Sequence, residues 1–110
     1  MAPPIQEPSE FTLGYETFRV VWFPRYAAVA EQKCWSVAES AGGRVPRALH
    51  YFVTLDAKGT PLEVTADETA LQGFPMPAGL RECVGGVVRT MRFPPSKPHS
   101  GRVQVDRRAP

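Results

Sequence analysis

The most informative stretch of the sequence is residues 47–59, which read RALHYFVTLDAKG. Every second residue from Leu49 to Leu55 is a large apolar one, a pattern typical of a strand with one buried face. Residues 56–59 (DAKG) end in a glycine and predict a hairpin connection. The return strand is predicted next, with inward-facing residues at Leu62, Val64 and Ala66.

Two amphipathic helices are predicted on either side of this hairpin. Residues 27–41 place apolar side chains at spacings of three and four, and Gly42-Gly43 ends that helix. Residues 80–91 carry a second such stripe, which ends before Phe93-Pro94-Pro95. Gly85-Gly86 lies inside the second helix, where glycine is costly, so we expect another element to approach its backbone closely.

Two outer strands complete the expected order. Residues 15–23 are rich in β-forming side chains and precede Pro24, which predicts a first strand. Residues 102–105 predict a last one. The expected fold is therefore α+β in the order (β)-α-β-β-α-β, with two helices packed on one face of a small antiparallel sheet. We expect a flexible leader at 1–14, one domain at 15–106 and a basic tail at 107–110.

The composition sets the class of protein. A chain of 110 residues has room for one domain, and 43% hydrophobic residues suit a packed core. Twelve prolines and nine glycines predict short elements and many loops. No apolar run is long enough to span a bilayer, and the N-terminus lacks the pattern of a signal peptide. These features exclude a multidomain enzyme and a membrane-embedded protein.

Charge is unevenly distributed along the chain. Residues 71–110 carry seven basic and two acidic side chains, whereas both earlier parts are slightly acidic. A basic C-terminal third is compatible with an anionic partner such as nucleic acid. The favoured interpretation is a solvated helix face followed by a cationic tail.

Cys34 and Cys83 are the only cysteines, and they leave two alternatives. Their positions on the inward faces of the two expected helices are compatible with two buried thiols or with one disulfide. We favour the disulfide, which would stabilise the fold by roughly 4 kcal/mol and would indicate an oxidising compartment.

Catalytic and ligand-binding motifs are weak in this sequence. The two cysteines and two histidines do not have the spacing of a zinc site, and no nucleotide-binding glycine loop is present. His50 is a lone strand histidine rather than part of a catalytic set. RNA-recognition modules share the element order, but here only Phe52 would face outward for base stacking. We therefore expect no enzyme activity, no cofactor and no metal.

One combination of motifs resembles a known family. A Cys34-Trp35 pair in the first helix precedes the strand that ends at Asp56-Ala57-Lys58-Gly59. The second helix contains residues 80–84 (LRECV) and is followed by residues 91–95 (MRFPP) and a last strand. Over about residues 27–106 this pattern resembles the two-cysteine, TonB-like C-terminal domain of myxobacterial gliding-motility proteins of the AgmX/PglI type.

The resemblance implies binding rather than catalysis. TonB-like domains link envelope layers by pairing a sheet edge with an extended segment of another protein, typically an outer-membrane or periplasmic one. The implied docking strand consists of Arg102, Val103, Gln104 and Val105, flanked by Arg107 and Arg108, which would favour an acidic segment. The alternative is that this strand only completes the sheet.

The expected function is thus a non-enzymatic envelope adaptor that transmits force. The expected compartment is the periplasm, although no export signal is visible and a cytoplasmic location stays open. The alternative function is a free-standing domain that binds nucleic acid or another anionic ligand through the basic third.

Overall fold

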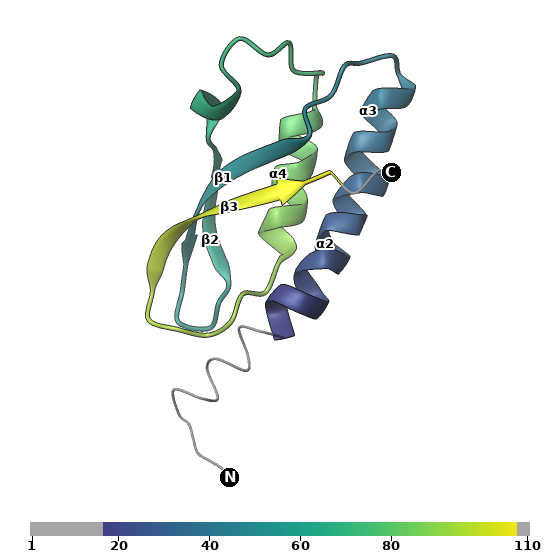
Figure 1. Ribbon diagram of the computed structural model, residues 1–110. Helices are drawn as coiled ribbons and strands as arrows, with labels where there is room; N and C mark the ends of the chain where they lie inside the picture. Colours follow the sequence, from purple (N-terminus) through teal and green to yellow (C-terminus); the bar gives the residue numbers. More distant parts are fainter. Residues whose placement is uncertain (1–16, 108–110) are drawn as a thin grey trace.

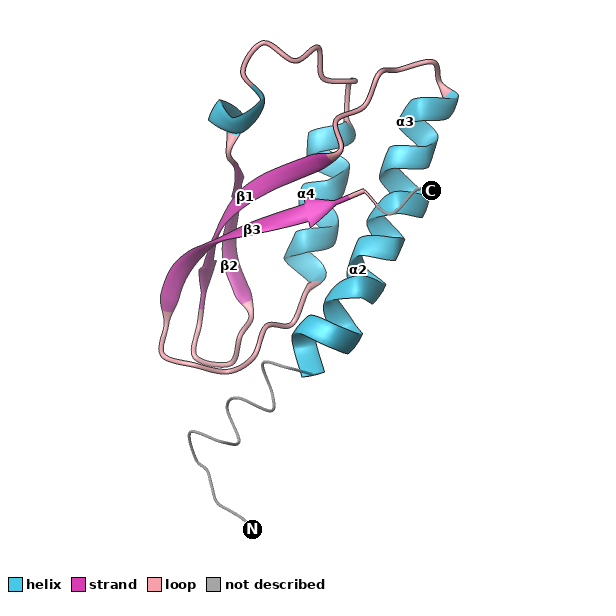
Figure 2. Ribbon diagram, viewed as in Figure 1, coloured by secondary structure: helices cyan, strands magenta, loops and turns pink. Residues whose placement is uncertain are grey.

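The computed structural model describes residues 17–107, apart from the side chain of Ala70. It contains a three-stranded antiparallel sheet with helices on one side (Figures 1 and 2). The α+β class and the two helices expected from the sequence are confirmed. The observed order is α-β-β-α-β, without a first strand in the described part of the chain. The predicted leader (1–14) and residues 108–110 of the predicted tail lie outside the described residues.

The predicted strand over 15–23 is wrong, because its described part is helical. One helix runs through the π-helical segment Phe18–Trp22, α2 (Phe23–Ala30), a second π-helical segment Glu31–Trp35 and α3 (Ser36–Ser40). Pro24 has no N–H to donate. The π-helical turn just before it is closed by a hydrogen bond from the Phe23 N–H to the Phe18 carbonyl. The β-forming side chains are tolerated because this helix needs only one apolar face. Val20 accordingly stays 59% exposed.

The central hairpin forms as predicted, with one change of register. Strand β1 (Ala48–Leu55) buries the four alternating apolar side chains from Leu49 to Leu55. Strand β2 (Pro61–Ala66) follows a turn in which Asp56 Oδ1 accepts the Lys58 and Thr60 N–H groups, each at 2.9 Å. Gly59 has φ +84°, and a Cβ there would overlap the Phe93 carbonyl.

Leu62 does not face the core, contrary to expectation. The pairing skips from Thr54↔Glu63 to Leu55↔Pro61, so Leu62 is the extra residue of an irregularity in the ladder. A one-residue shift turns a side chain to the other face of a strand, and Leu62 is 66% exposed. Val64, which lies beyond the irregularity, is buried as predicted.

Helix α4 (Leu80–Thr90) packs behind the sheet, against β2 and β1 (Figure 1). The predicted close approach occurs at Gly85, where a Cβ would come within 3.2 Å of the Tyr51 ring. The Tyr51 hydroxyl donates to the Arg81 carbonyl at 2.7 Å, and burial raises the pKa of this phenol well above its ordinary value of 10.0.

A disulfide joins Cys34 to Cys83, which resolves the alternative left open by the sequence. It links the N-terminal helix to α4 across a sequence separation of 49 residues. Trp35, next to it, is fully buried, and its indole N–H donates to the Pro46 carbonyl at 2.9 Å. The two helices are therefore fixed to each other under the sheet.

The last strand, β3 (His99–Asp106), is longer than the predicted 102–105. It pairs antiparallel with β1 along its whole length, from Ala48↔Asp106 to Leu55↔His99. The order in the sheet is β2-β1-β3. Both β2 and β3 are consequently edge strands.

Candidate functional site

Within residues 17–107, the outer side of β3 carries backbone groups without a hydrogen-bond partner. The Arg107 N–H donates to the Arg47 carbonyl at 2.7 Å, so these two residues form a hydrogen-bonded pair of the β1–β3 ladder. In an antiparallel ladder, residue pairs that are joined by backbone hydrogen bonds alternate with pairs that are not. The backbone groups of every second residue from Ser100 to Asp106 therefore point away from β1.

The β1–β2 ladder supports this assignment independently. The Asp67 N–H donates to the His50 carbonyl at 2.9 Å. The backbone groups of His50 therefore point toward β2. Gln104, which pairs with His50 in the β1–β3 ladder, makes no backbone hydrogen bond to it, so the backbone groups of Gln104 point away from β1. Within residues 17–107, the outward backbone groups of Arg102 and Gln104 have no hydrogen-bond partner.

A groove of about 500 Å³ lies beside this edge, between β3 and the start of the N-terminal helix. We call it the β3 groove. Its apolar lining comes from the helix start, from β1, from the segment after α4 and from β3, namely Phe18, Phe23, Val53, Leu55, Phe93 and Val103.

Aromatic rings form one wall of the β3 groove. The Phe18 and Phe93 rings lie 5.0 Å apart, and the Phe18 and Phe23 rings 5.9 Å apart. Gly101 leaves the opposite side open, because a Cβ built there meets nothing within 4 Å. The groove therefore has room for an apolar side chain directly beneath the edge of β3.

The four predicted docking residues all lie in β3, but their side chains have different surroundings. Val105 is fully buried and belongs to the core. Val103 is half-buried and lines the β3 groove. Arg102 and Gln104 are exposed and alternate with these valines, and both also border the β3 groove.

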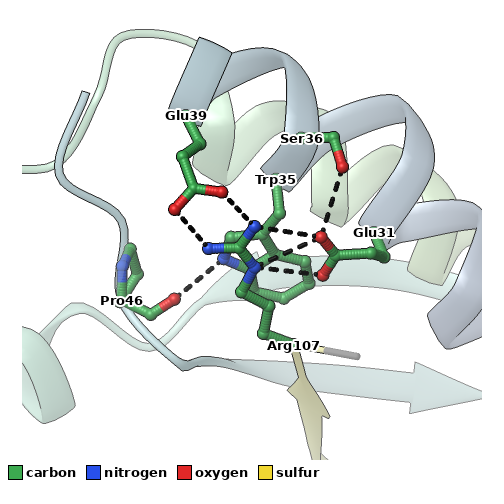
Figure 3. Close-up of polar contacts among 6 residues, drawn as sticks. All are labelled: Glu31, Trp35, Ser36, Glu39, Pro46 and Arg107. Carbon is green, nitrogen blue, oxygen red and sulfur yellow. Dashed lines mark hydrogen bonds and ion pairs between the residues drawn. The ribbon is translucent and has the colours of Figure 1, made fainter. Parts of the chain in front are cut away.

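Arg107 is engaged within the chain and does not extend into a tail. Its guanidinium binds Glu31 at 3.1 Å and Glu39 at 2.6 Å, above the buried Trp35 (Figure 3). The hydrogen bond from Arg107 lowers the pKa of Glu39 below its ordinary value of 4.5. We call this set of three residues the Arg107 clamp. Arg107 is therefore not available to attract an acidic partner, contrary to expectation, and Arg108 lies outside the described residues.

Other arginines of the basic third are also engaged. Arg102 binds Asp67 at 2.7 Å, and Arg81 lies 3.8 Å from Glu68. The Thr69 hydroxyl and then Arg102 lower the pKa of Asp67 by hydrogen bonding. Arg92 donates to the Met91 carbonyl. These contacts favour the interpretation of a solvated, internally paired surface over a polyanion site.

The opposite edge of the sheet is protected. Strand β2 begins with Pro61, which has no N–H to donate. Farther along β2, Arg89 of α4 donates to the Val64 carbonyl at 3.3 Å. Because Val64 pairs with Val53 without hydrogen bonds, that carbonyl is one of the outward groups of β2.

Neither a metal centre nor a membrane span is found in the described part of the chain. No three His, Cys, Asp or Glu side chains among residues 17–107 are arranged to hold a metal ion. No helix in that range has the length and apolar character needed to cross a bilayer. The Nδ1 atom of His50 is buried and has no hydrogen-bond partner.

The aromatic lining of the β3 groove was missed from the sequence. Phe18 was assigned to a strand, and Phe93 was considered only as part of a helix end. The available signal was Phe93-Pro94-Pro95, because a large ring between a helix and two prolines has to pack against some surface.

Comparison with known proteins adds no family. No protein family, no curated protein and no solved structure significantly matches the chain.

Proposed function

We propose that this chain is a non-enzymatic protein-interaction domain of the cell envelope that binds its partner by strand addition to β3. In this proposal it serves as a TonB-like adaptor that transmits force. Its partner is an extended segment of a periplasmic or outer-membrane protein.

The observation that carries the proposal is the unpaired outer side of β3 next to an apolar groove. Outward N–H and C=O groups supply affinity for any extended backbone. Every second side chain of an added strand would point to the helix side of the sheet, where the β3 groove lies. The groove therefore supplies selectivity for an apolar side chain.

The contrast with β2 supports β3 as the binding edge. Pro61 and Arg89 occupy pairing positions on β2, whereas β3 has eight residues with no comparable block. Proteins usually protect edges that are not meant to pair. An unprotected edge is thus a reasonable candidate for function.

The disulfide between Cys34 and Cys83 supports the envelope location. Structural disulfides persist in oxidising compartments such as the periplasm and are rare in the cytosol. Thiol alkylation in the native cells before lysis tests this part. We expect both cysteines to be protected until reductant is added, and immediate alkylation of both would contradict a periplasmic location.

Selection from a displayed library of extended peptides tests strand addition. We expect the peptides that bind the full chain to contain alternating apolar residues. They should bind at least roughly tenfold more weakly to Gln104→Pro, because proline removes an outward N–H from the edge. The position tolerates proline, since that N–H is not used in the β1–β3 ladder and Val103 is already extended.

Gln104→Thr is the matched control. It removes the same side chain, whose amide donates to Asp106 Oδ1, and keeps the N–H. Equal binding of the selected peptides to wild type and Gln104→Thr, with loss in Gln104→Pro, supports the proposal. Unchanged binding to Gln104→Pro would contradict it.

A further inference from the structure

We infer that the outer face of the N-terminal helix docks on an anionic lipid surface. This face consists of Trp22, Arg25, Val29, Lys33 and Val37, and we call it the outer stripe. None of these residues lines the β3 groove, so lipid docking is independent of strand addition and goes beyond the proposed function.

The outer stripe is continuous along the helix. Its residues follow one another at intervals of three or four, which brings their side chains to one side of a helix. All five are exposed, including 48% of Trp22, 38% of Val29 and 62% of Val37. The helix is buried on its other side, at Ala27 and Ala30, and forms one flank of the molecule (Figure 1). The stripe therefore leaves apolar surface uncovered within residues 17–107.

The charged residues of this helix are divided between its two sides. Its acidic residues, Glu31 and Glu39, bind the guanidinium of the Arg107 clamp (Figure 3). The charged residues of the outer stripe are both basic. Neither Arg25 nor Lys33 pairs with an acidic side chain within residues 17–107. A positive face that is also apolar favours a partner with negative charge above an apolar layer, which is the structure of an anionic membrane surface.

The order of the side chains fits a helix that lies flat on such a surface. Trp22 and the two valines can enter the boundary between headgroups and acyl chains, where tryptophan is enriched in proteins. The Arg25 guanidinium lies 5.1 Å from the centre of the Trp22 ring. This contact uses the flat face of the guanidinium and leaves its N–H groups available to headgroup phosphates. Lys33 can reach the same level by extending its alkyl chain along the helix.

Vesicle binding of the full chain tests the inference. We expect the chain to bind vesicles of phosphatidylcholine and phosphatidylglycerol at least roughly tenfold more tightly than vesicles of phosphatidylcholine alone, and to be released as salt is added. Trp22 reports the contact, because Trp35, the other tryptophan, is fully buried. The fluorescence of Trp22 should shift to shorter wavelength on binding.

Two variants with matched controls locate the contact. Val37→Asp should weaken vesicle binding by roughly tenfold, because anionic headgroups repel the added carboxylate. Leu62→Asp changes a similarly exposed apolar residue of β2 and should bind like wild type. Lys33→Gln should weaken binding by roughly fivefold, whereas Lys58→Gln, in the hairpin turn, should leave it unchanged.

An absence of vesicle binding, equal binding to both kinds of vesicle, or equal binding by Val37→Asp and wild type would overturn the inference. Dimerisation of wild type without lipid that is lost in Val37→Asp would assign the outer stripe to a second copy and would also overturn it. Gln104→Pro should bind vesicles like wild type. Failure of strand addition and failure of lipid docking are thereby distinguished.

Discussion

The two edge strands of this sheet differ in how their outer backbone groups are protected from pairing. At β2, a proline opens the strand, an irregularity displaces Leu62, and Arg89 of α4 caps the Val64 carbonyl. At β3, pairing with β1 is regular over eight residues, and no residue of the described range 17–107 caps the outer backbone groups. Helix α4 packs against β2 and leaves a hollow of about 240 Å³ there, whereas the larger β3 groove borders β3. Among the described residues, Pro61, the irregularity and Arg89 of α4 therefore protect β2, whereas no comparable feature covers β3.

The largest expected effect comes from breaking the link that holds α4 in place. Cys83→Ser removes the disulfide. Because the bridge closes a loop with a sequence separation of 49 and so restricts the unfolded chain, its loss should lower the free energy of unfolding by roughly 4 kcal/mol. Urea denaturation without reductant measures this loss. With reductant present, wild type and variant should unfold alike, and an equal deficit in both conditions would contradict a stabilising bridge.

The next effect concerns the attachment of β3. Arg107→Gln should lower the melting temperature near neutral pH by roughly 5 °C, because Glu31 and Glu39 lose their cationic partner. The pKa of Glu39 is lowered in the folded protein, so its contribution is complete above 4.5 and is lost as the pH falls through the folded-state pKa. The difference between wild type and variant should therefore shrink in acid.

Arg92→Gln is the control for that series. The Arg92 guanidinium donates to the Thr90 and Met91 carbonyls and binds no carboxylate among residues 17–107, so its replacement should give no pH-dependent difference near 4.5. Melting curves followed by circular dichroism across this range make the comparison. A constant difference between wild type and Arg107→Gln at every pH would mean that the clamp contributes little through charge.

A smaller effect on stability comes from uncovering β2. Arg89→Ala should cost roughly 1 kcal/mol, because the Val64 carbonyl loses a hydrogen bond. The same change frees the Val64 carbonyl for pairing, while Pro61 and the irregularity at Leu62 stay in place. Peptides that fail to bind Gln104→Pro should then regain measurable binding in the double variant Gln104→Pro/Arg89→Ala, as followed by fluorescence anisotropy. Continued absence of binding would mean that Arg89 is not what protects this edge.

The smallest effect on stability is expected from filling the β3 groove. Gly101→Val places a side chain in open space and should change the free energy of unfolding by less than about 1 kcal/mol. It should nevertheless weaken the selected peptides by roughly tenfold, as measured by calorimetry. Ser100→Val is the control, because that residue pairs with Thr54 on the opposite face of the sheet. Equal weakening by both variants would contradict a role for the groove.

The regular parts of the fold could be predicted from the sequence. Alternation from Leu49 to Leu55 and the apolar stripe of α4 each report a single buried face, and both were identified correctly. Cys34 and Cys83 fall on such faces, which made their bridge a favoured alternative. The last strand was also identified, although it is longer than predicted.

Features that depend on tertiary packing could not be predicted in the same way. Phe18 to Phe23 have β-forming side chains, but packing of Phe18 on Phe93 favours a helix there. The outward exposure of Leu62 depends on an irregularity that strand pattern alone does not reveal. The β3 groove is built from four separate segments, so no local pattern describes it. The combination of a free sheet edge and a neighbouring groove could therefore be recognised only in the three-dimensional structure.

The Arg107 clamp has a mechanical consequence. Tension on the chain beyond β3 would reach Arg107 first, because this residue follows Asp106 directly and pairs with Arg47 at the end of the β1–β3 ladder. The contacts with Glu31 and Glu39 would divert part of that load into the N-terminal helix, and the disulfide would pass it on to α4.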